Sequence, residues 1–490
     1  MIEAAHTLTY EELLFENLRL HEELAQLKRL IFGQKRERFV PLVNEQQLDI
    51  ALNEEPSTAP PVSTTTTTIS YTRHQKKSST TKLPSRNPLP AHLRREEIRL
   101  EPEGDVSDLK KIGEEITEEL EFVPPELYVK KYIRAKYAKP EGEGIVIAEL
   151  PTRPIEKGIA GPGLLAHILI SKFVDHLPLY RQQQQLRRQK VEIAESTMGG
   201  WVKACGEALL PLYEVQRACV QQASYLMADE TPLPVLDRTK PVKTHLGYHW
   251  VYYDPIAKLV LFDYRPGRSR AGPNDILKNF HGYLQCDGYT GYDDLLARPG
   301  VVGVGCFAHA RRYFEQAQDS DRERAEWMLV KLQALYRLER QAREAHMSFD
   351  ERHALRQEHA LPILQELRAW LGANSIAVLP KSAIGKAMGY MLGQWSKLEA
   401  YTRDGRLEID NNLVENAIRP VALGRKNYLF AGSHEGAKRA AIIYSLVATA
   451  KRHEVEPFTY LKDILTRIPD HPHHKLAELL PQNWTSPAAQ

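Results

Sequence analysis

Two acidic positions directly follow short apolar runs that have the composition of buried strands. Residues 225–228 run into Asp229 and Glu230, and residues 282–286 run into Asp287. We expect both runs to be strands, with the carboxylates at their C-terminal ends. Two carboxylates held near one another repel, and a divalent metal between them relieves this repulsion. Because Mg²⁺ prefers oxygen ligands and is held by one or two carboxylates with substrate phosphates, the pattern predicts a magnesium site for phosphoryl chemistry.

A third carboxylate that can complete this site lies in the segment 410–420. The segment opens with two residues that can cap a helix, Asp410 and Asn411, which places Glu415 about one turn inside it. Metal ions in pairs can activate the attacking oxygen and stabilise the leaving oxygen of an in-line displacement at phosphorus. Taken alone, the spacing favours an ordinary ion pair between Glu415 and Arg419, four residues later. The cations of this region that can neutralise phosphate are Arg419, Arg425 and Lys426.

The elements around these carboxylates have the pattern of strands. Residues 249–253 and 259–264 flank a turn of Asp, Pro, Ile and Ala, which predicts two antiparallel strands. A further apolar run, 301–307, ends just before a basic group. We expect His309 to be hydrogen-bonded at the end of that strand rather than catalytic. The basic group consists of His309, Arg311 and Arg312.

The residues before this segment, 163–222, have a helical pattern with three pieces. Helices are predicted over 164–174 and 179–189, and Ser196 or Thr197 can cap a third. A helix, a basic helix, a short turn and a capped helix are typical of a helix-turn-helix DNA-binding unit. A three-helix bundle with a solvated basic face would give the same pattern. The cations of the second helix and the turn after it include Arg187, Arg188 and Lys190.

The N-terminal residues have a different organisation. Apolar residues and one asparagine alternate at spacings of four and three, which predicts a coiled-coil helix that self-associates, or a short helix packed on its own chain. These positions are Leu13, Asn17, Leu20, Leu24, Leu27 and Ile31. The residues from 54 to 97 are rich in Thr, Pro and basic side chains, so we expect a disordered linker. The stretches 129–138 and 142–150 indicate a small β-containing module.

Composition excludes several classes of protein. The 490 residues are 42% hydrophobic and 26% charged, as in ordinary folded proteins. The formal net charge is +2, so any contact with nucleic acid must come from local clusters. The apolar run 440–450 is too short to span a membrane, and the acidic N-terminus is unlike a secretory signal. We therefore expect a cytoplasmic protein. Its four cysteines form no C-x-x-C pair.

Four long strings, in this order, resemble the insertion-sequence-sixty-six family of bacterial transposases. The segments 27–33 and 479–484 also resemble the family's N-terminal leucine-zipper segment and its C-terminal element, so nearly the whole chain is covered. The strings are Ala228-Asp229-Glu230-Thr231-Pro232, Leu284-Gln285-Cys286-Asp287-Gly288-Tyr289-Thr290-Gly291-Tyr292, Ala308-His309-Ala310-Arg311-Arg312 and Asn412-Leu413-Val414-Glu415-Asn416-Ala417-Ile418-Arg419-Pro420 with Arg425-Lys426-Asn427.

The resemblance implies an α/β ribonuclease-H-like core with an Asp-Asp-Glu triad, which falls on Asp229, Asp287 and Glu415. Asp287 and Glu415 are 128 positions apart, which leaves room for an inserted domain. The segments 322–344 and 351–371 have helical spacing, so we expect this insertion to be helical. The predicted parts are a coiled-coil, leucine-zipper-like helix (1–40), a disordered linker (41–97), a small β-containing module (98–155), a helical helix-turn-helix-like DNA-binding unit (156–222), the catalytic core (223–315 and 405–465), the helical insertion (316–404) and a C-terminal element (466–490).

The function implied by the resemblance is that of a DNA transposase that binds insertion-sequence ends and uses Mg²⁺, or Mn²⁺ in its place. Hydrolysis would expose a 3′-hydroxyl, which would then attack target DNA. The expected partners are double-stranded DNA, further copies of the chain and accessory proteins of the same element, in a bacterial, nucleoid-associated setting. A nuclease or resolvase that cuts without joining, and a DNA-binding protein with an inactive core, stay open. The phosphate contacts fall on Arg419, Arg425, Lys426, Arg311 and Arg312, with Arg187, Arg188 and Lys190 on the DNA-binding unit.

The chain departs from the family in the module after the linker. Relatives commonly carry two cysteine pairs there, which are interpreted as a zinc-binding element. The corresponding places in this chain are 101–104 and 138–141, and neither contains cysteine. Because no thiolate is available at these places, we expect no structural zinc.

Overall fold

The computed structural model describes residues 127–133, 136–138, 145–147, 151–156, 158–237 and 244–486. The chain divides into two compact units, residues 35–150 and residues 1–34 with 151–490. In the first unit, the short strands β1 (Lys136–Ala138) and β2 (Ile145–Ile147) pair antiparallel. The predicted coiled coil and linker lie outside the described residues. The predicted domain boundaries stay predictions.

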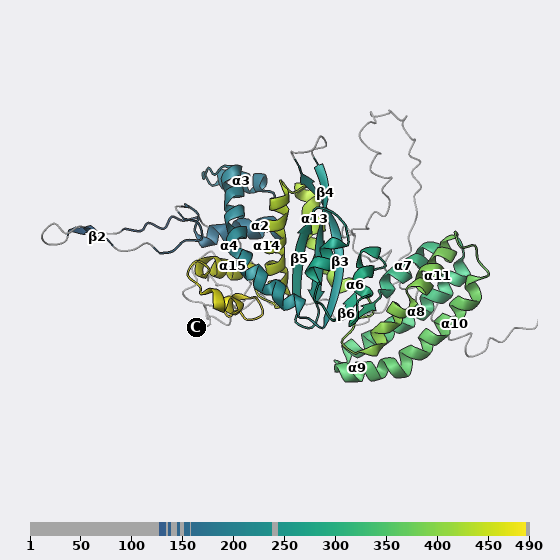
Figure 1. Cartoon of the computed structure of the whole chain (residues 1–490). Helices are drawn as coiled ribbons and strands as arrows, with labels where there is room; N and C mark the ends of the chain where they lie inside the picture. Colours follow the sequence, from purple (N-terminus) through teal and green to yellow (C-terminus); the bar gives the residue numbers. More distant parts are fainter. Residues whose placement is uncertain are drawn as a thin grey trace, which may run out of the picture. The chain divides into compact units, whose positions relative to one another are not determined.

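A five-stranded sheet lies at the centre of the second unit, with strand order β5-β4-β3-β6-β7 (Figure 1). Strands β3, β4 and β5 pair antiparallel, which confirms the predicted hairpin, while β6 and β7 run parallel to β3. A mixed α/β fold with many helices is therefore present. The strands are β3 (Tyr225–Leu236), β4 (Thr244–Asp254), β5 (Leu259–Arg265), β6 (Gly282–Gln285) and β7 (Val301–Val304).

Strand β3 is much longer than the predicted run of residues 225–228. It pairs with β4 all the way from Met227 to Leu236, whereas β6 pairs only with its first three residues. Asp229 and Glu230 therefore lie inside a strand and not at its end, which corrects the expectation. The strand continues because the long β4 supplies backbone partners to residues whose side chains are polar or Pro. Alternation of polar and apolar residues was too irregular there to indicate this.

The outer edge of the sheet is closed by two helices, α4 (Glu195–Gln221) and α14 (His434–Arg452). The amides of Val260 and Phe262 on β5 donate to Thr449 and Ser445 of α14, at 3.0 and 2.8 Å. Gln216 and Tyr213 of α4 donate to the carbonyl oxygens of the same two β5 residues. An edge strand with unpaired backbone groups is costly to bury. These side chains form hydrogen bonds with the free backbone groups of β5 and hold both helices against the sheet.

Further helices cover the sheet or follow β7. Helices α7, α8, α10 and α11 gather on the β6 side of the sheet (Figure 1). They are α2 (Pro162–Phe173), α3 (Leu179–Arg188), α5 (Ala271–Ile276), α6 (Asp293–Leu296), α7 (Phe307–Ala317), α8 (Arg322–Glu344), α9 (Phe349–Leu355), α10 (Leu361–Ser375), α11 (Ala383–Gly393), α12 (Trp395–Glu399), α13 (Asn412–Tyr428) and α15 (Pro457–Arg467), with 3₁₀ turns at Thr290–Tyr292, Ala400–Arg403 and His473–Leu479.

Two predicted helix boundaries are wrong for physical reasons. Helix α4 begins at Glu195 and its N-cap, Ala194, offers no side-chain cap, so neither Ser196 nor Thr197 starts the helix. The helix predicted over 351–371 is interrupted by a π turn at Arg356–Ala360. That turn allows Arg356, which is fully buried, to reach partners outside its own helix.

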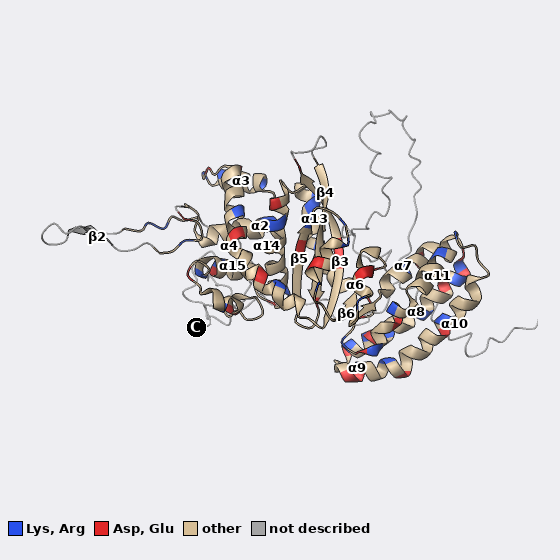
Figure 2. Ribbon diagram, in the orientation of Figure 1, with Lys and Arg blue, Asp and Glu red and all other residues tan. Residues whose placement is uncertain are grey.

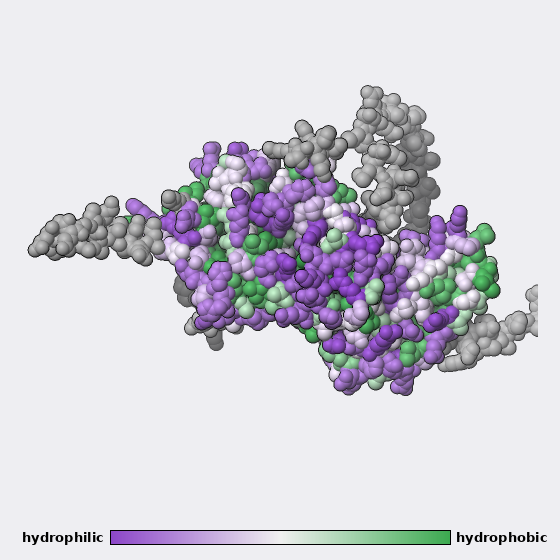
Figure 3. All heavy atoms as spheres, viewed as in Figure 1, coloured by the Kyte–Doolittle hydropathy of each residue, from purple (hydrophilic) through white to green (hydrophobic). Residues whose placement is uncertain are grey.

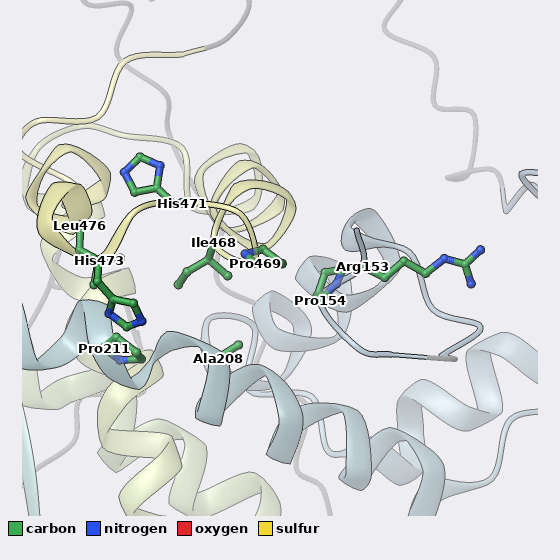
Figure 4. A pocket seen from close by; sticks show the side chains of 9 residues that line it. All are labelled: Arg153, Pro154, Ala208, Pro211, Ile468, Pro469, His471, His473 and Leu476. Atoms are coloured by element: carbon green, nitrogen blue, oxygen red, sulfur yellow. The ribbon is translucent and has the colours of Figure 1, made fainter. Parts of the chain in front are cut away.

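A pocket of about 180 Å³ lies between α4 and the C-terminal residues (Figure 4). Ala208 and Pro211 of α4 face Ile468 and Leu476 across it, and the side chain of Arg153 points away from the others. None of the predicted site residues lines this pocket. Within the described residues, no helix combines the length and the apolar character that a membrane span requires.

Candidate active site

The parallel register of β3 and β6 brings the two predicted aspartates to the same level. The last pair between these strands joins Met227 to Gln285, and Asp229 and Asp287 each lie two residues further along. Gly282 sets this register at the start of β6. Its φ is +135°, and a Cβ there would collide with the carbonyl oxygen of Ser224, which accepts from the Tyr283 amide at 2.9 Å. Only glycine meets both conditions without strain.

Each aspartate is oriented by a local backbone amide. Oδ1 of Asp229 accepts from the amide of Glu230 at 2.8 Å, and Oδ1 of Asp287 accepts from the amide of Tyr289 at 2.9 Å. The second bond makes an Asx turn, which directs the chain from the end of β6 into the 3₁₀ turn. Both carboxylates thus have a fixed direction and keep acceptor capacity for a cation.

Glu415 joins this group from the first turn of α13. It lies four residues beyond the N-cap Asn411, as expected, although the Asn411 side chain makes no capping bond. Its Oε1 lies 4.0 Å from Nε2 of His309, and the two side chains are 33% and 22% exposed. His309 is on α7 and not at a strand end, because β7 stops at Val304. At this separation the two side chains face each other without a hydrogen bond.

The electrostatics link Asp229 to the acidic residues around it. The pKa of Asp229 lies well above its usual value because its surroundings exclude water, and because Glu230, Asp287 and Glu415 add negative charge. The pKa of Glu230 is also raised, by burial first, and Asp287 contributes to it. Carboxyl groups whose ionised form is disfavoured in this way are stabilised most by a nearby cation.

The donor set is made of oxygen atoms, which suits Mg²⁺ or Mn²⁺. Among the described residues, no three His, Cys, Asp or Glu side chains are placed to hold one ion together. Mg²⁺ typically takes one or two carboxylates and completes its coordination with water and phosphate oxygens. Asp287 and Glu415 both contribute negative charge to the raised pKa of Asp229.

A buried network holds the segment before α13 next to the sheet. The side-chain amide of Gln285 on β6 donates to the carbonyl oxygens of Gly305 and Glu408, both at 2.9 Å. Tyr225 on β3 donates to Gln285 and accepts from the Glu408 amide. Residues 405–411 are thereby tied to both strands that carry the aspartates. This connection places the start of α13, and with it Glu415, at the end of the sheet.

The predicted phosphate-binding cations lie in different environments. Arg425 donates to the Thr231 hydroxyl at 3.1 Å and to the carbonyl oxygen of Pro232, so it braces α13 against β3. Burial lowers its pKa, and the described contacts give it no carboxylate partner. Arg311 forms an ion pair with Glu315 at 3.1 Å. Arg419 and Lys426 are exposed, and Arg312 is partly exposed.

The cations of the predicted DNA-binding unit lie on and just after α3. Arg187, Arg188 and Lys190 are all exposed, as expected for a solvated basic face. Lys and Arg colour parts of α3 and the neighbouring helices in Figure 2. Arg181 of the same helix donates to Oδ1 of Asn427 on α13, at 3.5 Å. The basic helix therefore meets the C-terminal end of the helix that carries Glu415.

Sequence reasoning missed the polar side chains that contact Glu230, next to Asp229. Glu230 forms an ion pair with Arg268 at 2.6 Å and accepts from the Tyr292 hydroxyl at 3.1 Å. The Arg268 guanidinium lies 3.9 Å from the ring centre of Tyr289. Tyr289 and Tyr292 belong to the motif that follows Asp287, and this was a usable signal. Arg268 comes from the loop after β5, which no spacing rule connects to Glu230.

Family models match almost the whole chain. The model described as Transposase IS66 family matches residues 157–439, and the IS66 C-terminal element matches 445–482. The model described as Transposase C of IS166 homeodomain matches residues 19–98. The zinc-finger binding domain of transposase IS66 matches residues 102–138.

Full-length relatives are found in Sinorhizobium fredii (strain NBRC 101917 / NGR234). Uncharacterized protein y4hP is 32% identical over 499 residues, which covers 96% of this chain and 89% of that protein. Uncharacterized protein y4jD is 32% identical over 95% of this chain and 94% of its own length. Uncharacterized protein y4qI is 34% identical over 94% of this chain and 88% of its own length.

The expectation of no zinc is wrong, because residues 102–138 match the zinc-finger binding domain of the family. That expectation rested on two places without cysteine, whereas the match extends over the whole module. The family matches confirm the resemblance drawn from the motifs and make DNA the class of partner. With the main family model covering residues 157–439 and relatives aligned over nearly the whole length, the chain belongs to the IS66 family of transposases, a family of DNA-transposing enzymes.

Proposed function

We propose that this chain cleaves DNA at insertion-sequence ends and joins the freed 3′ ends to target DNA, on a ribonuclease-H-like core with Asp229, Asp287 and Glu415 as catalytic residues. The observation that carries the proposal is the convergence of these carboxyls from β3, the end of β6 and the first turn of α13. Glu415 and Asp287 both raise the pKa of Asp229. This convergence supports a shared site for divalent cations.

Asp229 with Asp287 would hold one Mg²⁺, and Asp229 with Glu415 would hold a second. When bound, the two ions supply stabilisation of both the attacking and the leaving oxygen in a displacement at phosphorus. The chain's own residues do the positioning. The Asx turn holds the direction of Asp287, and His309 faces Glu415 at 4.0 Å. Cleavage and joining are both in-line displacements, so one set of carboxylates serves both steps.

DNA approaches this acidic group against electrostatic repulsion, which nearby cations must offset. In the proposal, Arg419, Lys426 and Arg425 on α13 contact phosphates on one side, with Arg311 and Arg312 of α7 on another. Arg425 also braces α13, so its removal would displace Glu415 as well as remove charge. Further copies of the chain, joined through the predicted N-terminal coiled coil, would hold two element ends together.

The test is a cleavage and joining assay with the full-length chain. The substrate is a labelled duplex carrying the terminal repeats that flank this coding sequence, with Mg²⁺ or Mn²⁺ and a supercoiled target. Wild type should cut and join, whereas Glu415→Gln should bind the duplex with unchanged affinity and do neither. Glu435→Gln is the matched control, because Glu435 also lies in the first turn of a helix, α14, and pairs only locally with Lys438 in the described contacts.

Each outcome discriminates among the functions. Cutting without joining would support a nuclease or resolvase in place of a transposase. Activity of Glu415→Gln equal to that of Glu435→Gln would remove Glu415 from the catalytic set. A wild type that binds the duplex and never cuts it, with either metal, would support a DNA-binding protein with an inactive core.

A further inference from the structure

The arginine that sequence reasoning missed, Arg268, lies in the loop between β5 and α5 and points to the strand that carries Asp229. Its Nε and Nη2 both lie close to Oε1 of Glu230, at 2.7 and 2.6 Å. The other carboxylate oxygen of Glu230 accepts from Tyr292. The exposures of the pair differ sharply, since the Glu230 side chain is 3% exposed and that of Arg268 is 45% exposed. A buried carboxylate thus anchors a cation that faces solvent.

A second set of contacts ties the same arginine to Asp287. The Tyr289 ring lies under the guanidinium at 3.9 Å, and the Tyr289 hydroxyl donates to the backbone carbonyl oxygen of Arg268. The amide of Tyr289 is the group that fixes Asp287. Partial burial lowers the pKa of Arg268, and Glu230, Tyr289 and Asp287 together raise it above its usual value. Arg268 therefore senses the charge of both Glu230 and Asp287.

The geometry leaves the guanidinium with donors to spare. Arginine has five N–H groups in one plane, and this one directs only its Nε and Nη2 edge to a single carboxylate oxygen. Within the described part of the chain it makes no other hydrogen bond. An arginine held on two sides by Glu230 and an aromatic ring, with its outer N–H groups exposed, is preorganised to bind an anion.

We propose that Arg268 contacts the DNA phosphate next to the one that is attacked, on the side of the site formed by Asp229 and Asp287. The inference rests on the proposed function and adds a contact to it. A phosphate backbone that reaches Asp229, Glu230, Asp287 and Glu415 meets four carboxyl groups. Arg268 is a cation fixed directly at one of these, Glu230, and it lies against Tyr289, whose amide orients Asp287. The surface over β3 and α6 is hydrophilic in the view of Figure 3.

Arg270 provides a matched control from the same loop. It is two residues away and is 60% exposed, and its Nη1 pairs with Oδ1 of Asp294 at 2.9 Å. Asp294 is itself 44% exposed, so this pair lies at the surface and not against a buried carboxylate. Substitution of Arg270 removes the same formal charge from the same loop. It leaves the contacts to Glu230 and Tyr289 in place.

The experiment compares Arg268→Gln, Arg268→Lys and Arg270→Gln in the full-length chain on the element-end duplex. Binding is measured across a series of salt concentrations, and cleavage is measured at saturating DNA. Each phosphate contact contributes about 0.9 to the slope of log K against log salt. Arg268→Gln should lower the slope by about that amount and should slow cleavage about 10- to 100-fold, as expected for one hydrogen bond to a charged group. Arg270→Gln should change neither.

Arg268→Lys separates a phosphate contact from a structural role. Lysine keeps the charge, so the salt slope should return to the wild-type value, while cleavage should recover only in part because lysine lacks the planar fork. The proposal would be overturned if the slope of log K against log salt were unchanged in Arg268→Gln. It would also be overturned if Arg268→Gln and Arg270→Gln lowered this slope equally. If wild type never cleaves and Arg268→Gln still loses slope relative to Arg270→Gln, the contact stands and the proposed function fails.

Discussion

Asp229 occupies a position that is unfavourable for a charged carboxylate. Water is largely excluded from its carboxyl, and three other acidic residues contribute repulsion. Such groups raise one another's pKa, and a bound cation reverses the effect. The fold keeps Asp229 there through the pairing of β3 with β4 on one side and β6 on the other. At the scale of single residues, burial and neighbouring negative charge therefore disfavour the ionised form of Asp229, and the proposed divalent ion would relieve this repulsion.

The repulsion around Asp229 predicts that thermal stability differs with and without metal. Mg²⁺ or Mn²⁺ should raise the melting temperature of wild type by a few degrees, since a ligand at a hundred times its Kd stabilises by about 2.7 kcal/mol. Asp287→Asn should melt no lower than wild type in EDTA, because repulsion is relieved, and should lose most of the response to metal. The exposed Asp293, six residues later, gives the control Asp293→Asn, which should respond like wild type. An equal response of all three proteins would place the metal elsewhere.

At the scale of elements, the helices between β7 and α13 are joined to the site by buried charges. Glu339 on α8 accepts from Arg352 and Arg356, and these three side chains are between 0% and 8% exposed. Arg356 also donates to the carbonyl oxygens of Tyr401, Asp404 and Leu407. Those carbonyls belong to the segment that leads into α13. The helices after β7 thus set the position of the helix that carries Glu415.

The network predicts that Glu339→Gln strongly lowers the free energy of unfolding. The buried Arg356 would lose its carboxylate partner, which typically costs about 3–5 kcal/mol, while Arg352 would keep its pair with Glu408 at 2.8 Å. Burial raises the pKa of Glu339, but the two arginines more than offset this, so its pKa lies below 4.5. The stabilisation is therefore complete above pH 4.5 and is lost as the pH falls through the pKa of the folded state. In urea denaturation, the free energy of unfolding of the variant should lie well below that of wild type at pH 7. The difference should become smaller below pH 4.5.

An exposed ion pair between α8 and α10 supplies the control for this prediction. Glu366→Gln removes a partner of Lys331 on α8, in a pair of 2.6 Å whose side chains are 26% and 48% exposed. Exposed pairs of this kind contribute about 0–1 kcal/mol. Equal losses in the two variants would show that the buried network carries no special stability.

At the scale of the whole molecule, the net charge of +2 gives no general attraction for DNA. Attraction must come from local groups, and the cations on α3 are exposed beside the end of α13. If α3 contacts phosphates, each lost arginine should reduce the salt dependence of binding.

The double variant Arg187→Gln/Arg188→Gln should lower the slope of log K against log salt by about 1.8, since each contact contributes about 0.9. The rate of cleavage at saturating DNA should change little, because neither residue adjoins the carboxylates. Arg322, an exposed arginine of α8 that pairs with Glu326, provides the control Arg322→Gln. A slope unaffected in the double variant would exclude α3 from the DNA contact.

The family and the residues of the candidate site could be predicted from local sequence alone. The motifs around Asp229, Asp287 and Glu415 are short contiguous segments. Such segments contain both the reactive residue types and the local preference for strand or helix. The hairpin of β4 and β5 and the first-turn position of Glu415 were predicted correctly for the same reason. The zinc expectation failed where a judgement about a whole module rested on a few missing cysteines.

Which residues lie opposite one another in the fold could be read only from the tertiary structure. The register of β3 with β6, which puts Asp229 level with Asp287, depends on pairing between segments far apart in the chain. The length of β3 depends on β4, and the pairing of Glu230 with Arg268 depends on a loop that leaves from β5. Such contacts are fixed by packing and hydrogen-bond satisfaction across the fold, and no spacing within the sequence encodes them.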